Sequence, residues 1–333
     1  MGIELIHADG GFNELRELME FDQFDANISM SPESGDNDWM LELPSLEWQR
    51  MPVLPGHFVY ISGSEWGGQA ERIRHSTSDS TVRVYGTCWR GILARKAVCP
   101  PAGDTHVVFS STDASQVISS LLGGWMPRIF RTADGSSGIS CSGSVRYKPL
   151  LDALYSLLGD ASARLCVRFT EGMVRLWAER IRDHSSDIEL SQDYESVIIA
   201  ERRLSQFNHI VALGQGEMLE RDVKELWLLP DGSVTENSSS PGVPEAGMIS
   251  TYIYDYPAVE SASVLRSEAE KKLRSLAGGD SMEITVSGSE SELELTDRVS
   301  VRDRLTGISS ILSVYEKNLN ISAGGVRIKH ILK

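Results

Sequence analysis

The feature that most constrains the fold of this chain is a strand pattern that occurs twice. One copy covers residues 55–85 and breaks at Gly67, and the other covers residues 296–329 and breaks at Gly307. In both copies, apolar residues recur at every second position on either side of a glycine turn, which is typical of a half-buried antiparallel meander. The pattern predicts two similar β-barrels in one chain. The predicted equivalents are Phe58, Tyr60, Val82 and Val84 in the first copy and Val299, Val301, Val326 and Ile328 in the second.

Length and composition exclude several classes of protein. With 333 residues, of which 41% are hydrophobic and 24% charged, the chain is long enough for two or three domains. No apolar run approaches the roughly 18–20 residues of a membrane-spanning helix, and the first residues lack the pattern of an export signal. The four cysteines match neither a disulfide-dense scaffold nor a zinc ribbon. We therefore expect buried, reduced thiols in a protein made in a reducing cytosol.

The charge balance bears on nucleic acids. A formal net charge of -15 argues against a groove that grips a phosphate backbone, because such affinity comes from lysine and arginine side chains that displace counterions. A surface that repels DNA can still let DNA slide past it.

The order of the predicted elements divides the chain into four stretches. Residues 1–103 are strand-rich and predict the first part of the first barrel, which residues 187–229 complete. Residues 104–186 change to helical spacing and predict an α+β insertion domain. Residues 230–333 predict the second barrel, with an inserted helix at about residues 259–277. The predicted fold class is mainly β (α+β), with two similar β-barrel domains, an α/β insertion domain and a second insertion that contains a helix.

Local sequence patterns predict two helices and a hairpin in the insertion at residues 104–186. Asp113 is the predicted N-cap of a helix that ends at Gly123. A second apolar stripe predicts a helix at residues 149–159. A pair of strands follows, with a hairpin turn at Glu171 and Gly172.

Catalytic and metal-binding signatures are missing from the sequence. The seven histidines form no HxH or HExxH pattern, and no Walker motif or nucleophile elbow occurs. Gly214 and Gly216 resemble the start of a dinucleotide-binding loop, but Met218 and Leu219 stand where further glycines are expected. We therefore predict no catalytic residue, no cofactor and no metal site, and a protein that is not an enzyme.

Three segments carry more specific patterns. The first is a strand with the pattern W-x-L-x-L-P at residues 39–44, and the second is a strand that leads into a short helix at residues 85–101. The third is an apolar strand that ends in a glycine-flanked acidic turn at residues 208–221. The residues that carry the patterns are Trp39, Leu41, Leu43 and Pro44, then Gly86, Trp89, Leu93, Arg95 and Pro100, and finally Gly214, Gly216, Glu217 and Arg221.

In this order along the chain, the three segments resemble the baseplate-hub proteins of long-tailed bacteriophages. They are most similar to the siphophage tail proteins called Gp37-like and to the N-terminal hub part of tail-associated lysins. The resemblance covers nearly the whole chain. The sequence departs from the family at Met218, where a small residue is common, and after Lys333, where the family commonly continues into lysin or fibre-anchoring domains.

The resemblance implies a structural hub without chemistry of its own. Two similar barrels with an α/β insertion between them would assemble as a homotrimeric ring at the virion tail tip, after synthesis in the host cytoplasm. The implied neighbours are a distal tail or tail-tube protein, a tape-measure protein, and a tail-tip or receptor-binding protein. DNA would pass through the channel without specific binding. Three chains with two barrels each would match the six equivalent sites of a hexameric tail tube.

The second segment suggests a packing role. Trp89 and Leu93 are predicted to be buried on the inner face of a short helix that closes the first barrel and that Pro100 ends.

The third segment contains the most interface-like turn, at residues 214–217, because its glycines allow close backbone approach. Glu217 and Arg221 supply a charge pair that is satisfied either within the chain or across a trimer contact. The plainer interpretation of every motif residue is that it shapes a turn or fills a core, which suits a structural protein equally well.

Two other classes of function stay open. A receptor- or glycan-binding adhesin built on β-modules is favoured if several of Trp48, Trp66, Trp125 and Trp177 are exposed. A wall-degrading enzyme is the third class, and it would need nucleophile or metal signatures that the sequence lacks.

Overall fold

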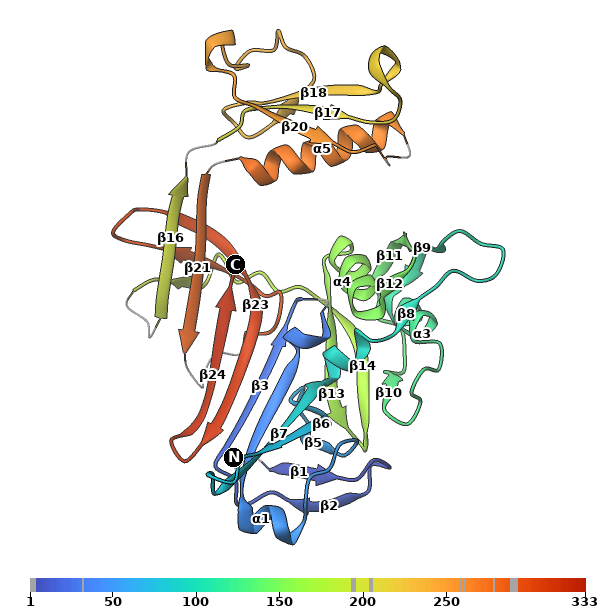
Figure 1. Ribbon diagram of the computed structural model, residues 1–333, viewed down its shortest axis with the longest axis vertical. Coiled ribbons are helices and arrows are strands. Elements are labelled where there is room, and N and C mark those ends of the chain that lie inside the picture. The colour runs from blue at the N-terminus through green and yellow to red at the C-terminus, as the bar shows by residue number, and fades with distance from the viewer. Residues whose placement is uncertain are drawn as a thin grey trace. The chain divides into compact units, whose positions relative to one another are not determined.

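The chain forms two compact units (Figure 1). Unit 1 comprises Met1–Ile199 and Glu283–Lys333, and unit 2 comprises Ala200–Met282. The computed structural model describes residues 4–31, 33–192, 196–203, 206–257, 259, 261–277, 279–287 and 293–333.

Unit 1 is built around one large sheet that is mostly antiparallel. Its strands follow the order β16-β21-β24-β23-β3-β4-β7-β6-β5-β1-β2, and β15 and β22 pair beside this path. The bounds of these strands are β1 (Leu5–Ala8), β2 (Glu14–Glu17), β3 (Gln23–Ser29), β4 (Asp38–Pro44), β5 (Phe58–Ile61), β6 (Gly67–His75), β7 (Thr81–Cys88), β15 (Glu189–Leu190), β16 (Ser196–Arg203), β21 (Gly279–Ser287), β22 (Arg298–Arg302), β23 (Ser309–Ser322) and β24 (Gly325–Leu332). A short helix, α1 (Ser45–Arg50), follows β4.

Alternation along the strands gives this sheet an apolar and a polar face. Phe24, Ala26 and Ile28 of β3 are buried, and so are Trp39 and Leu41 of β4, while the residues between them are less buried. Because successive side chains of a strand point to opposite faces, these positions all lie on one side of the sheet. The apolar residues at every second position of these strands therefore form the core face of the sheet.

The strand path does not close on itself. In the described chain its ends are β16 and β2, and no pairing joins them. The predicted mainly β class is confirmed, but the described pairings do not form two separate closed barrels. The reason lies in β23, which spans 14 residues and pairs with β24 on one side and with β3 on the other. One long strand thus joins the C-terminal strands to the N-terminal ones.

Both predicted strand repeats form three-stranded antiparallel meanders. The first consists of β5, β6 and β7, and the second consists of β22, β23 and β24. Phe58 and Tyr60 are buried in the first, as are Val299 and Val301 in the second, whereas Val326 is 37% exposed. Val326 lies near the tip of the β23–β24 hairpin, where it pairs beside the turn. The residue-by-residue superposition of the two copies stays a prediction.

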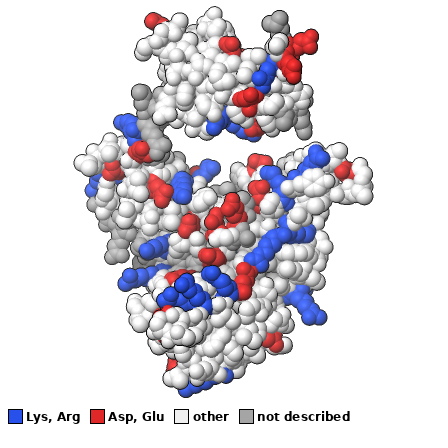
Figure 2. All heavy atoms as spheres, in the orientation of Figure 1, with Lys and Arg blue, Asp and Glu red and all other residues white. Residues whose placement is uncertain are grey.

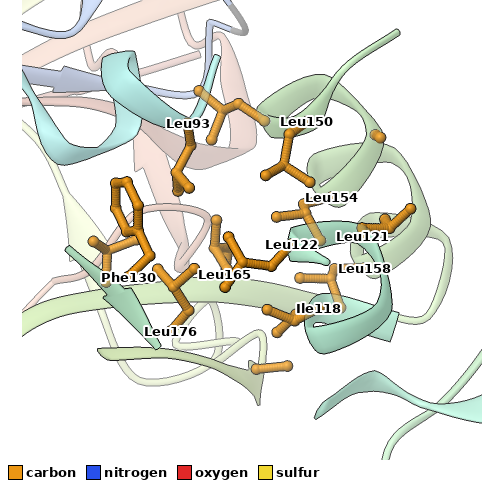
Figure 3. Close-up of a cluster of buried hydrophobic side chains, with 14 of the residues drawn as sticks. Leu93, Ile118, Leu121, Leu122, Phe130, Leu150, Leu154, Leu158, Leu165 and Leu176 are labelled. Atoms are coloured by element: carbon orange, nitrogen blue, oxygen red, sulfur yellow. The ribbon is translucent and has the colours of Figure 1, made fainter. Parts of the chain in front are cut away.

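Residues 89–180 add helices and small sheets that share one hydrophobic core with the large sheet. The elements are α2 (Trp89–Leu93), β8 (Ala97–Val98), β9 (Val107–Asp113), α3 (Ala114–Leu122), β10 (Phe130–Thr132), β11 (Ser140–Val145), β12 (Lys148–Pro149), α4 (Leu150–Asp160), β13 (Ala163–Thr170) and β14 (Met173–Arg180). Figure 3 shows Leu93, Leu154, Leu165 and Leu176 pointing toward one another from four of these elements. The same cluster continues to Phe58 of β5. The predicted α+β insertion is therefore packed onto the first strands through a continuous core.

The local signals of this insertion are confirmed. The Asp113 carboxylate accepts a hydrogen bond of 2.9 Å from the Ser115 backbone N–H at the start of α3, and Gly123 ends the helix with a φ of 54°. Glu171 and Gly172 have φ values of 52° and 74°, the left-handed pair that a tight two-residue hairpin requires. The hairpin joins β13 to β14.

Unit 2 is a four-stranded sheet with one face covered by a helix (Figure 1). The strand order is β19-β18-β17-β20, with β17 antiparallel to β18 and parallel to β20. The elements are β17 (His209–Leu213), β18 (Val223–Leu228), β19 (Val234–Thr235), β20 (Thr251–Asp255) and α5 (Ala262–Leu276). Leu265, Ala269 and Leu273 of α5 pack with Ile210 and Ala212 of β17. The predicted amphipathic helix is confirmed.

The boundary between the units differs from the predicted domain boundaries. Residues 187–229 were expected to complete the first barrel, but β17 and β18 pair with β20 and pack on α5 in unit 2. The boundaries differ because residues 209–213 pair in parallel with residues 251–255. Such a pairing depends on contacts across a long loop, which periodicity alone does not reveal.

Candidate functional site

The first motif segment builds a close contact between two strands. Trp39 of β4 lies directly opposite Gly86 of β7. A Cβ atom at Gly86 would overlap the Trp39 ring and the Gln69 carbonyl oxygen. Only glycine leaves room for the indole here, so the motif residues Trp39 and Gly86 are one packing unit. Leu41 and Leu43 continue the buried row.

The second motif segment places Trp89 in a cluster of aromatic rings. Trp89 is fully buried on α2, and its ring centroid lies 5.9 Å from that of Phe58, 5.8 Å from Phe169 and 6.3 Å from Phe12. These distances suit stacked aromatic contacts. Leu93 is also fully buried, in the core shown in Figure 3. The predicted burial of Trp89 and Leu93 is confirmed, and their helix lies between the first sheet and the insertion.

The end of this segment differs from the prediction. The helix α2 ends at Leu93, and residues Ala97–Val98 form a strand that pairs with β12, so Pro100 does not end the helix. Pro100 lies in the loop after this strand. Arg95 donates a hydrogen bond of 2.7 Å to the Thr87 hydroxyl and pairs with Glu71. Arg95 therefore supports the turn after α2 from within the chain.

A buried ionic cluster in unit 1 joins segments that are far apart in the sequence. The Lys317 ammonium on β23 lies 2.6 Å from the Glu65 carboxylate and 2.8 Å from Glu294. Arg90 of α2 also pairs with Glu65, at 3.4 Å. Burial by itself raises the pKa of Glu65, but Lys317 and Arg90 outweigh it and hold that pKa below its usual value. The carboxylate is thus kept charged inside the protein.

The cluster extends to the insertion. Arg164 of β13 lies 2.6 Å from the Asp297 carboxylate, which is fully buried, and 2.9 Å from that of Glu179. Asp297 also accepts a hydrogen bond of 2.9 Å from the Glu294 backbone N–H. The insertion is therefore tied to the turn that precedes β22. Breaking a buried pair of this kind is strongly destabilising because it leaves an uncompensated charge.

A cavity of about 480 Å³ lies beside the ionic cluster. Its lining includes Glu65, Trp66, Arg90, Arg164, Glu294 and Lys317. Burial raises the pKa of Cys166 in its wall to about 12, and burial together with Lys317 lowers the pKa of His330 to about 4. At neutral pH this wall holds a protonated thiol and a neutral imidazole. The chemistry of the cluster is that of a structural clamp between β23, α2 and β13.

The ionic cluster could not be recognised from the sequence. Glu65 and Lys317 are 252 positions apart, and no local pattern marks Glu65 as buried. Figure 2 shows acidic side chains gathered over the middle of unit 1 and bordered by lysine and arginine side chains. The one available signal is the position of Lys317 between apolar residues of a strand, at a place that periodicity assigns to the core face.

The third motif segment forms the loop between β17 and β18 in unit 2. Gly216 has a φ of 93°, and a Cβ atom there would overlap the Glu220 carbonyl oxygen. The Gly214 N–H donates to the Asp222 carbonyl at 2.7 Å. Arg221 donates through Nε to the Gly214 carbonyl at 3.1 Å and pairs with Asp255 of β20. The structure therefore brings Gly214, Gly216 and Arg221 together in one rigid turn.

The expected charge pair within this turn is different from the observed one. Arg221 pairs with Asp255, and among the described residues Glu217 forms no ion pair. Arg221 therefore has a partner inside the chain, and a role of this turn at a contact between copies stays a prediction. Glu217 is exposed in the turn.

The four tryptophans that would favour an adhesin if exposed are buried or partly buried. Trp66 is buried, and Trp48, Trp125 and Trp177 are each partly buried, so none of the four tryptophans favours the adhesin class by its exposure.

All four cysteines are free, with Cys88 and Cys141 buried and Cys99 exposed. Within the described ranges, no helix is long and apolar enough to cross a membrane, and no group of three or more metal-ligating side chains occurs.

Comparison with solved structures identifies the fold. The 43 kDa tail protein of prophage MuSo2 from Shewanella oneidensis matches with a TM-score of 0.58 at 12% identity, over 99% of this chain and 98% of that one. The tail protein from Neisseria meningitidis MC58 has a TM-score of 0.55 at 14% identity, over 100% and 97% of the two chains. The prophage tail protein gp18 from Listeria monocytogenes EGD-e has a TM-score of 0.53 at 14% identity, over 98% and 94%. No family model and no curated protein matches the sequence. The chain thus shares its fold with solved phage tail proteins along nearly its whole length.

Proposed function

We propose that the chain is a structural baseplate-hub or tail-tip subunit of a bacteriophage tail or of a related injection device. The observation that carries the proposal is the likeness to three solved tail proteins, which covers at least 94% of each of them and at least 98% of this chain. A match confined to one β-module would leave the function open, because many unrelated functions use the same modules. A likeness that covers nearly the whole of both chains is a narrower criterion.

In the proposed assembly, three chains form a ring that joins a hexameric tail tube to the tip. The two antiparallel meanders, β5–β6–β7 and β22–β23–β24, support this arrangement. Two similar elements in each chain would let a threefold ring present six related contacts. The neighbours in the proposal are a distal tail or tail-tube protein, a tape-measure protein and a tip or receptor-binding protein.

The proposed ring surrounds the channel through which DNA leaves the tail. The net charge of -15 supports this part of the proposal, because fixed cationic contacts would retain the phosphate backbone during passage. In this role the chain needs no catalytic group of its own, and it is incorporated at the tail tip during assembly in the host.

The first experiment measures the mass of the purified chain by light scattering over a dilution series. A ring predicts a species of three times 36.7 kDa. The second labels the chain with gold-conjugated antibodies on purified tails and predicts label at the distal end. A monomer at every concentration would remove the ring from the proposal, and label distributed along the tube or absent from tails would overturn the tip assignment itself.

A further inference from the structure

Met218 lies in the loop that joins β17 to β18 in unit 2. Met218 is 94% exposed and has a φ of 51°, a backbone region that side-chain-bearing residues seldom adopt. Such a conformation is strained and persists only where the surroundings impose it. Here the surrounding turn imposes it, through Gly216 and the bonds of Arg221 to the Gly214 carbonyl and to Asp255.

The sheet face opposite α5 carries further apolar side chains at the end next to this loop. Ile210 and Ala212 of β17 point toward α5, so Val211 and Leu213 point to the opposite face, since alternate residues of a strand face opposite ways. Val211 lies beside Ile253 of β20, and Leu213 lies beside Val223 of β18. Ile253 is 58% exposed and Val223 is 47% exposed.

We call Met218, Val211, Leu213, Val223 and Ile253 the Met218 surface. Met218 lies on the β17–β18 loop, Leu213 and Val223 lie at the strand ends next to this loop, and Val211 and Ile253 pair further along the same face. Methionine is an adaptable apolar anchor that recurs at binding surfaces. Exposed apolar side chains that are grouped and rimmed by polar residues mark sites of protein contact more often than single ones do.

Carboxylates border the Met218 surface. Glu217 and Glu220 flank Met218 in the loop, and all three are exposed. Glu225 follows Val223 on the same face of β18, and Asp255 follows Ile253 on the same face of β20. The cation in the loop, Arg221, is paired with Asp255. The border is therefore acidic, and a complementary surface would carry lysine or arginine around an apolar recess.

We propose that the Met218 surface docks a different protein of the assembly, one that presents an apolar recess bordered by lysine and arginine side chains. A second copy of this chain is the poorer occupant, because its net charge of -15 opposes an acidic border. The inference rests on the proposed function, which places the chain beside other tail proteins. It assigns the contact to unit 2 and to Met218 as its anchor.

The test places a photoreactive benzophenone amino acid at position 218 and, as a control, at position 19 in purified tails. Met19 is 81% exposed and lies in unit 1. Irradiation at position 218 is expected to give a cross-link to a peptide of another tail protein that contains apolar residues and lysine or arginine. A cross-link to a second copy of the chain, to an acidic peptide, or no cross-link beyond that of the control would overturn the inference.

The two proposals fail in different ways. If the chain is absent from the tails, the proposed function falls and the docking surface falls with it. If the chain is present but its position 218 gives only the control result, only the docking surface falls.

Substitutions give a second measurement. Met218→Glu is expected to lower by about tenfold the amount of the neighbouring protein, once the cross-link has identified it, that is retained in purified tails, because a carboxylate would enter an apolar recess within an already acidic border. Met218→Leu should stay within about twofold of the parent, as expected for a volume-conserving apolar change. Met19→Glu is the matched control and should have no effect. Equal amounts of the neighbouring protein in Met218→Glu and Met19→Glu tails would overturn the assignment of Met218 as the anchor.

Discussion

Gly86 shows how the absence of a side chain can fix the packing of a sheet. The Trp39 ring occupies the space where a Cβ atom of residue 86 would lie, and the Gln69 carbonyl closes the other side. Strand backbones on both sides leave little freedom to move away. The sequence pattern contains both residues, but their dependence on each other becomes visible only in the strand register.

Gly86→Ala is expected to destabilise the protein by about 1–3 kcal/mol, the usual cost of overpacking a well-packed core. The measurement is the free energy of unfolding in urea. Gly35→Ala is the matched control, because a Cβ atom there would meet nothing within 4 Å. A Gly86→Ala protein as stable as this control would contradict the packing described for Trp39.

Trp89 carries a different kind of packing. Its ring is fully buried and stacks near Phe12, Phe58 and Phe169. Trp89→Ala is expected to cost about 3–5 kcal/mol, since a large ring is lost from a core that cannot fully collapse. Thermal unfolding followed by circular dichroism would show a lower midpoint. A substitution that leaves the midpoint unchanged would mean that the aromatic cluster does not support the fold.

At the scale of elements, α3 depends on one carboxylate at its start. Asp113 accepts hydrogen bonds from the N–H groups of Ser115, Ser137 and Gly138 and from the Ser136 hydroxyl. These bonds hold the pKa of Asp113 well below its usual range, although partial burial opposes them. The cap thus fixes both the helix and the loop that returns to β11.

Asp113→Ala is expected to cost about 2 kcal/mol, the upper end for loss of an N-cap, because the loop loses its acceptor as well. Asp113→Asn keeps an acceptor oxygen and should cost clearly less. Hydrogen exchange of the α3 amides is the most direct measurement. Equal protection of these amides in both variants and in the parent would contradict the capping role.

The ionic cluster links elements rather than shaping any one of them. Lys317→Met removes the cation between Glu65 and Glu294 and is expected to cost about 3–5 kcal/mol, because the buried Glu65 carboxylate loses a partner. Adding Glu65→Gln should restore part of the loss, with a coupling energy of about 1–3 kcal/mol in a double-mutant cycle of unfolding free energies. Strictly additive losses would show that Lys317 and Glu65 do not act together.

At the scale of the whole molecule, two buried histidines make the stability depend on pH. His7 is fully buried against His57, with ring nitrogens 2.8 Å apart, and His330 is buried beside Lys317. Burial is the main cause that lowers the pKa of each to about 4. Each histidine has a lower pKa in the folded protein than in the unfolded chain, so it contributes stability to the folded state. This contribution is fully present above the unfolded pKa of about 6.5 and is lost as the pH falls toward 4.

Between pH 7.5 and 5.0, each histidine is expected to remove about 2 kcal/mol of stability, from 1.36 kcal/mol for each pH unit below 6.5. Urea unfolding at the two pH values measures the loss. His330→Gln should reduce the difference between them, and His75→Gln, at an exposed position, should leave it unchanged. A difference that persists in full in His330→Gln would exclude His330 as a source.

Much of the local structure could be predicted from the sequence. The α3 helix with its cap at Asp113, the hairpin at Glu171 and Gly172, and the amphipathic α5 were all expected and are all present. Each depends on residues within a few positions of one another, such as a capping side chain, a left-handed turn or one apolar stripe. The burial of Trp89 and Leu93 could be predicted for the same reason.

Short-range patterns in the sequence were thus sufficient to predict α3, the β13–β14 hairpin and α5, and the period-two alternation predicted a mainly β fold. Three features became visible only in the folded chain: β23 links both meanders into one sheet, β17 and β18 belong to unit 2, and Lys317 pairs with Glu65. These outcomes depend on which distant strands pair and in which register. Many pairings satisfy the same alternation of apolar residues, and the choice among them is made by packing and charge contacts that form only when the whole chain folds.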